Sequence, residues 1–409
     1  SDIIHRQQEG YTRAQMWSGL CRGVVGTMLH TVFRGGAPEG RALFCGGMFL
    51  SMQVRRWTEA FVPGAVFHPD GNFFSARGAL ECAARRKHFT TLPRPVKSLG
   101  ERGADERVLE LALSRHEMPP ALREYASSGN EVRIHEEIIP GAAYALGIDV
   151  GSTSTKCALV DVATRAVVAD IYRKTGGDPT AAARALFAEL RSILVDGAQV
   201  PVAATTGSGR RLIGELAGAQ LIVNEITAHF RGAAECDPGI ETIFEIGGQD
   251  AKYIRGAGGA VQDCAMNYVC AAGTGSFVEE QASRLGFDVR EIGALTAGVR
   301  VPHASDRCTV FMEQDIHALM RDCRTREEAL AGVMFAVAKN YLHRVVGQRP
   351  VTGNKVFFQG ATARNRGLVA AFELLLGREI VVSPYCHVMG AYGAALLALE
   401  RAGSAERAF

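Results

Sequence analysis

Two segments of the sequence combine small residues with a carboxylate at the end of an apolar run, a composition that suits phosphate binding. The first segment is GIDVGSTSTK at 147–156. Small side chains let backbone N–H groups approach phosphate oxygens, an acid at a strand end can hold Mg²⁺ through water, and a lysine can neutralise a phosphate. The candidate residues are Asp149, Gly151, Ser152, Thr153, Ser154 and Lys156. Taken alone, the segment is equally compatible with a Gly-Ser hairpin that has no function.

The second segment, FEIGGQDAK at 244–252, again places a glycine pair and a carboxylate at the end of a buried strand. Its candidate residues are Gly247, Gly248, Gln249 and Asp250. Two such loops suit a cleft between two related lobes, where they hold one Mg–nucleotide from both sides. Asp149 or Asp250 would be the catalytic carboxylate that orients Mg²⁺ or the attacking water.

Two further glycine turns suit the remaining parts of a nucleotide. Their residues are Gly273, Thr274 and Gly275 for the β-phosphate, and Gly360 and Ala361 for the adenosine end. None of these segments is a P-loop or a GxGxxG motif. The prediction of a nucleotide site therefore depends on the set of segments and their order.

Two of the ten cysteines each precede an apparent helix start. Cys270 begins CAAGTGSF and Cys308 begins CTVF. A helix N-terminus favours a thiolate and suits an anionic iron–sulfur cluster, but a [4Fe–4S] cluster usually takes four cysteines. A second subunit with the same pair would complete the set; spacing alone favours two buried core cysteines. Core positions are also expected for Cys45, Cys82, Cys157 and Cys386.

The elements that must position these residues alternate along the chain, which predicts an α/β fold. Strands are expected at 144–150, 202–205, 241–246 and 355–359, and a hairpin from 158–161 and 166–172. Helices are expected at 179–195, 275–285, 327–346 and 366–376. The predicted ATPase lobes are 144–265 and 266–409, the second of which carries the two cysteines.

The part of the chain before these lobes divides in two. Residues 92–143 are rich in Pro, Gly and charge and are predicted to be a linker with short helices. Within residues 1–91, ALFCGGMFLS at 42–51 resembles VFFQGATARN at 356–365, and residues 65–85 resemble 381–401. We interpret 1–91 as a lobe that resembles the C-terminal ATPase lobe; the alternative is two unrelated strand–helix units. It has no counterpart of GIDVGSTST, so it should not bind a nucleotide unaided.

The composition is that of an ordinary globular protein. Of 409 residues, 47% are hydrophobic and 22% charged, and the formal net charge is +2. This balance gives no electrostatic reason to expect nucleic acid or an anionic membrane as a partner. No signal peptide or apolar run of ~20 residues is visible, which predicts a cytoplasmic protein with reduced thiols.

The two phosphate segments and the glycine turns together resemble the acetate/sugar kinase–Hsp70–actin superfamily of ATPases. That resemblance implies a two-lobed, RNase H-like α/β fold, here with an extra N-terminal half-lobe repeat. With CAAGTGSF and CTVF added, residues from about 145 to 400 are similar to the activators of 2-hydroxyacyl-CoA dehydratases and the ATP-hydrolysing subunits of benzoyl-CoA reductases. In that family two ATPase subunits share one [4Fe–4S] cluster, which implies that Cys270 and Cys308 are its ligands here. ATP hydrolysis then drives a low-potential electron into a partner.

The resemblance leaves the type of partner to be chosen. Because 146 residues precede Gly147, the chain looks most like the larger ATPase subunit of a benzoyl-CoA reductase, an ATP-dependent oxidoreductase. That interpretation implies a smaller homologous ATPase subunit that shares the cluster, reductase subunits that bind substrate and clusters, and an electron donor such as ferredoxin. The alternative is a homodimeric dehydratase activator. A redox-silent kinase or chaperone-like ATPase is more distant.

Overall fold

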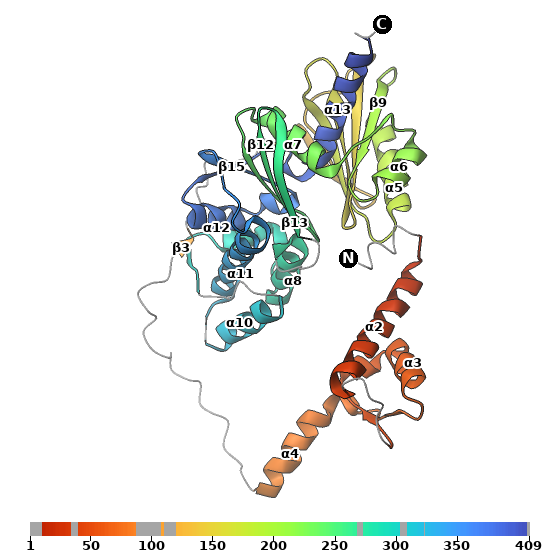
Figure 1. Ribbon diagram of the computed structural model, residues 1–409, viewed down its shortest axis with the longest axis vertical. Coiled ribbons are helices and arrows are strands. Elements are labelled where there is room, and N and C mark those ends of the chain that lie inside the picture. The colour runs from red at the N-terminus through yellow and green to blue at the C-terminus, as the bar shows by residue number, and fades with distance from the viewer. Residues whose placement is uncertain are drawn as a thin grey trace. The chain divides into compact units, whose positions relative to one another are not determined.

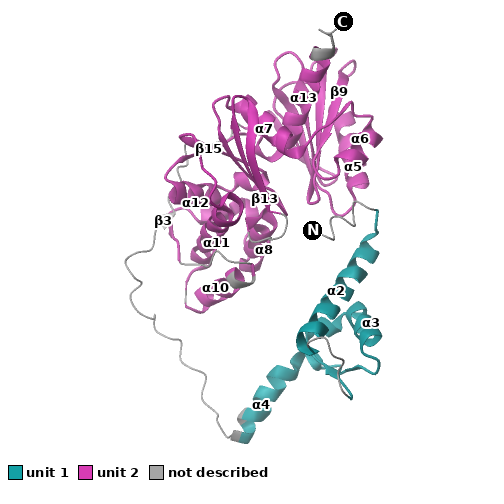
Figure 2. Cartoon of the chain, viewed as in Figure 1, with its two compact units in different colours: residues 1–99 teal, residues 100–409 magenta. Residues whose placement is uncertain are grey.

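The computed structural model describes residues 10–33, 40–86, 108–109, 120–267, 273–302, 309–322 and 324–406. The chain forms two compact units, residues 1–99 and 100–409 (Figure 2). Among the described helices, none is long and apolar enough to cross a membrane.

The second unit contains two sheets, and the first of them defines lobe I. Its seven strands run in the order β10-β9-β6-β7-β8-β5-β4. The strands are β4 (Arg123–Ser127), β5 (Asn130–Ile134), β6 (Ala143–Val150), β7 (Ser154–Asp161), β8 (Val167–Lys174), β9 (Gln199–Thr206) and β10 (Leu221–Ile222). The accompanying helices are α5 (Pro179–Ile193), α6 (Arg210–Ala217) and α7 (Glu225–Cys236).

The central strand β6 is apolar along its length because both of its faces are covered. Tyr144, Leu146 and Ile148 belong to the core cluster that includes Leu186 of α5. Ala145 belongs to the cluster formed with α13 (Met389–Glu406). A strand buried on both sides reads as a continuous hydrophobic run, which is why residues 144–150 were recognisable. Figure 1 shows α13 lying along this sheet.

The second sheet defines lobe II and has the order β13-β12-β11-β15-β16. Its strands are β11 (Thr242–Ile246), β12 (Ala251–Ala257), β13 (Ala260–Asn267), β15 (Lys355–Gln359) and β16 (Glu379–Val382). Its helices are α8 (Gly275–Leu285), α9 (Ile292–Leu295), α10 (Thr309–Arg321), α11 (Arg326–Tyr341, continued by Leu342–Val346) and α12 (Arg366–Leu376). The short strands β3 (Val108–Leu109) and β14 (Val299–Arg300) pair with each other.

Helix α11 is the centre of the lobe II core. Most of its side chains are buried, from Glu328 to Tyr341. It contacts α8, α10 and α12, so apolar residues occur all around the helix rather than on one stripe. A capping box at Thr325 and Glu328 fixes where the helix begins.

The first unit is much smaller. It contains α2 (Arg13–Phe33), β1 (Leu43–Phe44), α3 (Met52–Phe61), β2 (Val66–Phe67) and α4 (Phe74–Arg86), with 3₁₀ turns at Gly47–Leu50 and Gly71–Phe73. Its buried cluster is Cys21, Val25, Phe44, Phe49, Val54 and Val62. Strands β1 and β2 pair in parallel.

Most predicted elements are confirmed, and two expectations are wrong. The predicted linker contains β4 and β5 of the lobe I sheet where short helices were expected, so this lobe begins before residue 144. Cys157 and Cys386 are buried and Cys45 is half-buried, but Cys82 is exposed. Cys82 lies on α4, and none of the described side chains on that helix is buried.

Candidate functional site

The lobe I half of the site is the β6–β7 hairpin. Asp149 and Lys156 face each other as register partners, and Lys156 Nζ lies 2.9 Å from Asp149 Oδ2. Burial acts to raise the pKa of Asp149, but the charge and hydrogen bond of Lys156, together with weaker contributions from His229 and Lys252, outweigh burial, and the pKa lies below its ordinary value. The carboxylate is therefore anionic at neutral pH and is available to a cation.

Two hydrogen bonds, one from the backbone and one from a hydroxyl group, fix the turn between these strands. The N–H of Gly151 donates to Ser154 O at 2.9 Å, and Thr175 Oγ1 donates to Gly151 O at 2.7 Å. Thr153 Oγ1 is buried and has no hydrogen-bond partner among the residues that the structure describes. A buried hydroxyl without a partner is costly, so this atom is suited to receive a ligand.

The lobe II half is the β11–β12 hairpin, and it repeats the lobe I pairing. Glu245 and Lys252 are register partners, and Lys252 Nζ lies 2.8 Å from Glu245 Oε2. Two further carboxylates reach the same ammonium: Glu225 Oε1 at 2.9 Å and Asp250 Oδ2 at 3.0 Å. The Lys252 side chain is only 1% exposed. One buried ammonium thus serves three carboxylates.

The excess of carboxylates over ammonium groups in this cluster contributes to a raised pKa of Glu245. Burial raises it, and the negative charge of Asp250 adds to that effect, while Lys252 opposes both; the pKa rises to about 7. Burial also raises the pKa of Glu225. The cluster of Glu225, Glu245, Asp250 and Lys252, here called the lysine cage, can therefore hold a proton near neutral pH.

The two predicted phosphate segments lie against each other. A Cβ added to Gly248 would lie 2.6 Å from the side chain of Thr153, and Ser152 Oγ makes a long contact of 3.5 Å with Gln249 Oε1. Only glycine permits this approach. The prediction that the segments face each other across one site agrees with this arrangement.

Helix α8 is attached directly to the second of these segments. The N–H groups of Gly275 and Ser276 donate to the carbonyl oxygens of Gly247 and Gly248, both at 2.9 Å. Lys174 of β8 also forms an ion pair with Glu279 of α8. The first turn of α8 must therefore follow any displacement of residues 247–248.

The other glycine turns pack around the same loop. Gly360 has φ +92°, and a Cβ there would collide with Ile246 O. Thr362 Oγ1 donates to the same oxygen at 2.7 Å, and a Cβ on Gly275 would lie 2.6 Å from Thr362. A Cβ on Gly273 would lie 3.1 Å from Asn340 Oδ1. These turns thus enclose the end of β11, and Ala361 follows Gly360 in the 3₁₀ turn.

Two glycine backbones pack closely against the Asp149 carboxylate. A Cβ at Gly207 would lie 2.5 Å from Asp149 Oδ1, and one at Gly390 would lie 2.9 Å from Oδ2. His229 Nε2 would lie 3.1 Å from that same Gly390 Cβ. A side chain at either position would collide with the carboxylate as it is placed here.

His229, which also lies beside Gly390, is neutral at neutral pH. Burial lowers its pKa to about 3, and the charge of Lys252 acts in the same direction. Its Nδ1 lies 3.0 Å from Gln359 Nε2, which donates, so Nδ1 accepts and the ring proton is on Nε2. Gln359 Oε1 is buried without a hydrogen-bond partner in the described part of the chain.

Of the lysine cage, only Asp250 was among the site residues predicted from the sequence; the remaining cage residues, and His229 and Gln359 beside them, were not. The sequence did hold a signal for the Glu245–Lys252 pair, because these two residues have the same spacing as Asp149 and Lys156. The residue in lobe II that matches Asp149 by register is Glu245, whereas Asp250 lies in the loop before β12. Glu225 comes from α7, and local sequence gives no sign that it reaches Lys252.

Cys270 and Cys308 lie outside the described residues. Helix α8 begins five residues after Cys270, and α10 begins at Thr309, directly after Cys308. Within the described ranges, no group of three or more His, Cys, Asp or Glu side chains is arranged to hold a metal ion.

Comparison with known proteins gives consistent matches to the second unit. The model of the BadF/BadG/BcrA/BcrD ATPase family matches residues 146–398, more than half of the chain. The (R)-2-hydroxyglutaryl-CoA dehydratase activating ATPase of Acidaminococcus fermentans is 33% identical over 262 residues, 63% of this chain and 98% of that protein. One of the benzoyl-CoA reductase subunits of Thauera aromatica is 28% identical over 61% of this chain and 91% of that protein.

Solved structures agree on the fold. The crystal structure of the Acidaminococcus fermentans dehydratase component A is 30% identical and superimposes with a TM-score of 0.59 over 64% of this chain and all of that one. The activator of the 2-hydroxyisocaproyl-CoA dehydratase from Clostridium difficile, with bound ADPNP, gives 0.57 at 30% identity over 65% of this chain and 98% of that one. The predicted two-lobed α/β fold of the actin, Hsp70 and sugar-kinase class is confirmed.

Proposed function

The chain belongs to the BadF/BadG/BcrA/BcrD ATPase family, and from that premise we propose that it is an ATP-hydrolysing activator that delivers electrons to a 2-hydroxyacyl-CoA dehydratase. The observation that carries the proposal is the pair of glycine loops in contact at Thr153 and Gly248, each beside a carboxylate–lysine pair. Relatives at 33% and 30% identity over nearly their whole length are dehydratase activators.

The two loops would hold the phosphates of ATP from opposite sides. Backbone N–H groups of residues 151–154 and 247–249, with Thr153 Oγ1, would donate to phosphate oxygens. Asp149 would hold Mg²⁺ through water. Lys156 would neutralise phosphate charge, and the turn at Gly360 and Ala361 would contact the adenosine.

The lysine cage would act on the water that attacks the terminal phosphate. Glu225 and Glu245 are carboxylates with raised pKa values next to the loop of Gly248. A carboxylate that is deprotonated can accept a proton from water, and Lys252 compensates the charge of whichever carboxylate remains ionised. Asp149 would stay ionised throughout because its pKa is lowered.

The two cysteines that precede helices α8 and α10 in the sequence would suit the ligation of an iron–sulfur cluster. Cys270 and Cys308 give each chain two thiols, each shortly before a helix start, so two chains would supply the usual four ligands. When bound, a [4Fe–4S] cluster supplies one-electron transfer at low potential. The chain's own contribution is a link from nucleotide to cysteine segment: Gly247 and Gly248 hold the first turn of α8.

The relative in Thauera aromatica supports a second candidate, an ATPase subunit of a benzoyl-CoA reductase. In that case the chain would pair with a smaller homologous ATPase subunit and pass electrons, received from a donor such as ferredoxin, to substrate-binding reductase subunits. The two candidates share the ATP site and the cysteine pair and differ in the acceptor.

Anoxic purification with iron and sulfide analysis tests the shared part of the proposal. We expect ~4 iron atoms per two chains, and we expect Cys270→Ser and Cys308→Ser to lose iron while the protein still hydrolyses ATP. A colourless wild-type ATPase without iron would sink the electron-transfer role and favour a redox-silent ATPase. Adding ATP and a reductant with either a 2-hydroxyacyl-CoA dehydratase or a benzoyl-CoA reductase core then separates the two acceptors.

A further inference from the structure

The described part of the first unit, residues 13–33 and 40–86, repeats the last part of lobe II element by element. In both places a helix, a strand, a 3₁₀ turn, a helix, a second strand, a 3₁₀ turn and a last helix follow in the same order. The strands pair in parallel with equivalent register: Leu43 with Val66 in one copy, and Phe357 with Val381 in the other.

The turns of the two copies also share their backbone geometry. Gly46 has φ 116° and ψ 160°, and Gly360 has φ 92° and ψ 162°. The Gly46 N–H donates to Gly71 O at 3.0 Å, and the Gly360 N–H donates to Cys386 O at 2.8 Å. Such an unusual glycine conformation with the same long-range hydrogen bond identifies the two segments as copies of one structural unit.

The first exposed surface of the copy is the free edge of β1. In lobe II the equivalent strand β15 pairs with β11 on its other side, and Phe357 is 1% exposed. Among the described residues β1 pairs with β2 alone, and Leu43, at the position of Phe357, is 53% exposed. A short hydrophobic edge strand of this kind is a site for strand addition.

The second surface is one face of α4. In the equivalent helix α13, a Cβ on Gly393 would collide with Ala228 O, because α7 packs there backbone to backbone. Gly78 holds the same position on α4, and a Cβ there would meet nothing within 4 Å. A glycine in an exposed helix interior only weakens the helix, so it has no packing role within the described part of this chain.

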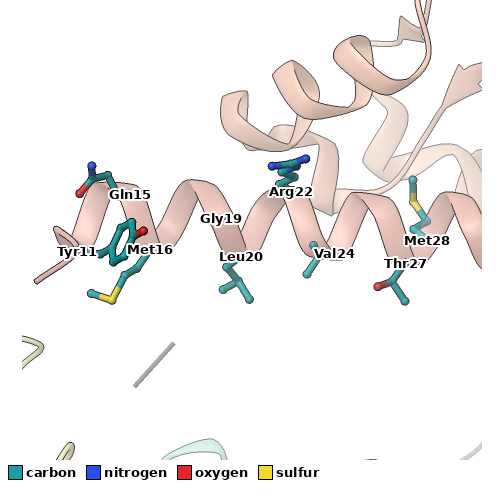
Figure 3. Close-up of a pocket in the computed structure, with 10 residues that line it drawn as sticks. Tyr11, Gln15, Met16, Gly19, Leu20, Arg22, Val24, Thr27 and Met28 are labelled. Atoms are coloured by element: carbon teal, nitrogen blue, oxygen red, sulfur yellow. The ribbon is translucent and has the colours of Figure 1, made fainter. Parts of the chain in front are cut away.

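The third surface is the apolar face of α2, the helix that corresponds to α11. Helix α11 contacts α8 and α10 as well as α12, whereas α2 contacts α3, the equivalent of α12. Figure 3 shows the side chains of Met16, Leu20, Val24 and Thr27 along one side of α2, and those of Gln15 and Arg22 pointing the other way; all six residues line a pocket. Leu20 and Val24 are both exposed.

We propose that these three surfaces of the first unit form one docking site for a polypeptide that carries the remainder of an ATPase module of this same family. In unit 2 the three equivalent surfaces are covered by β11, by lobe I with α7, and by α8 and α10, which all lie within residues 120–325. The partner is therefore a segment equivalent to 120–325 that lacks its own C-terminal part.

A second copy of this chain does not offer the required surfaces. Its β11 is already paired with β15, and its lobe I sheet and α7 are already covered by α13. The partner must leave these positions open. It lies outside these 409 residues, and it would place Gly46 and Gly47 where Gly360 and Ala361 lie in unit 2.

Co-expression of the full chain with a tagged probe tests the proposal. The probe is residues 120–325 of this sequence with Cys270→Ser and Cys308→Ser, so that a shared cluster cannot join it to the full chain. We expect the probe to be recovered with the full chain, and recovery to drop by roughly tenfold or more for Gly78→Trp, which obstructs the copied helix contact. Glu59→Ala, exposed on α3, is the matched control and should leave recovery unchanged.

The proposal would be overturned if the probe is recovered equally well with the Gly78→Trp variant. It would also be overturned if the probe is recovered with neither the wild-type chain nor the variant. A second measurement does not depend on the probe. In the full chain alone, Gly78→Ala should slow amide exchange in α4, because alanine favours a helix whose face is open. Unchanged or faster exchange would mean that this face is already packed, which also overturns the proposal. Neither result depends on the proposed electron transfer.

Discussion

The two halves of the candidate site use the same pairing of a carboxylate and a lysine but differ in charge. In lobe I, Asp149 faces Lys156, whose side chain is 17% exposed; in lobe II, Glu245 faces Lys252, which is 1% exposed and also binds Glu225 and Asp250. The pKa of Asp149 is lowered, whereas that of Glu245 is raised to about 7.

The difference in charge suits the two halves to two tasks of an ATP site, binding a cation and holding a proton. A one-to-one pair keeps its carboxylate ionised, which suits a cation-binding position. A cage with three carboxylates on one ammonium has an excess of negative charge in a buried place, so one carboxyl group retains a proton near neutral pH. The hairpin repeat alone sets the geometry, and the extra carboxylates from α7 and the loop change the chemistry.

The largest expected effect comes from the lobe I carboxylate. Asp149→Asn should lower the rate of ATP hydrolysis by ~10²–10³-fold, because the substitution removes a preorganised charge at the phosphate site. Phosphate release measured under saturating Mg–ATP gives the rate. Asp196→Asn, in an exposed loop, is the control and should keep wild-type activity. Equal rates for the two variants would show that Asp149 has no role in catalysis.

Loss of the ammonium at the centre of the lysine cage should lower the stability of the fold more than loss of the lobe I lysine. Lys252→Met leaves buried carboxylates without their cation and should lower the free energy of unfolding by ~3–5 kcal/mol at neutral pH. Lys156→Met should cost less, ~1–3 kcal/mol, because water reaches that pair. Denaturant titration measures both. A larger loss for Lys156→Met would reverse the comparison between the halves.

The pH dependence of stability should have opposite signs in the two halves. The pKa of Glu245 is raised in the folded protein, from an ordinary 4.5 to about 7, so the fold binds this proton more tightly. Its contribution to stability is therefore full below pH 4.5 and declines as the pH rises toward about 7. Asp149, with a lowered pKa, contributes fully above pH 3.8 and loses this contribution below it.

Unfolding measured between about pH 5 and 8 separates these contributions. Glu245→Gln should flatten the decline in stability across this range, because the glutamine does not titrate. An unchanged slope in Glu245→Gln would show that another group holds the proton.

The smallest effect is expected where the lobes meet at the surface. Lys174→Ala removes an exposed ion pair with Glu279 and should change the free energy of unfolding by less than ~1 kcal/mol. Thermal unfolding at low and high salt measures the contribution, which salt should reduce further. A loss comparable to that of Lys156→Met would mean that this contact holds the lobes together.

Much of the fold could be predicted because its signals are local. Helices 275–285 and 366–376 end at Gly286 and Gly377, which adopt the left-handed conformation that marks helix ends. The strands β4 and β5 were missed although Ser128 and Gly129, both with positive φ, form the turn between them. The edge strand β4 is exposed along most of its length, and β5 beside it buries only alternate residues, so the hydrophobic signal was weak.

The site was predictable only in part, for a physical reason. Glycine loops and strand-end acids are sequence-local, so Asp149, Thr153 and Gly248 could be named in advance. The cage depends on Glu225 of α7 reaching Lys252 of β12, a tertiary contact that no local pattern encodes. The repeated seven-residue spacing from Asp149 to Lys156 and from Glu245 to Lys252 was the available signal for half of it.

The central claim is that ATP held between the two loops drives electron transfer through the cysteine segments. The most direct test measures ATP hydrolysis and reduction of a 2-hydroxyacyl-CoA dehydratase in one anoxic preparation of wild type, Asp149→Asn and Cys270→Ser. We predict that Asp149→Asn keeps its iron and loses both activities, and that Cys270→Ser loses only the reduction. Reduction at the wild-type rate by Asp149→Asn, or by Cys270→Ser, would contradict the account.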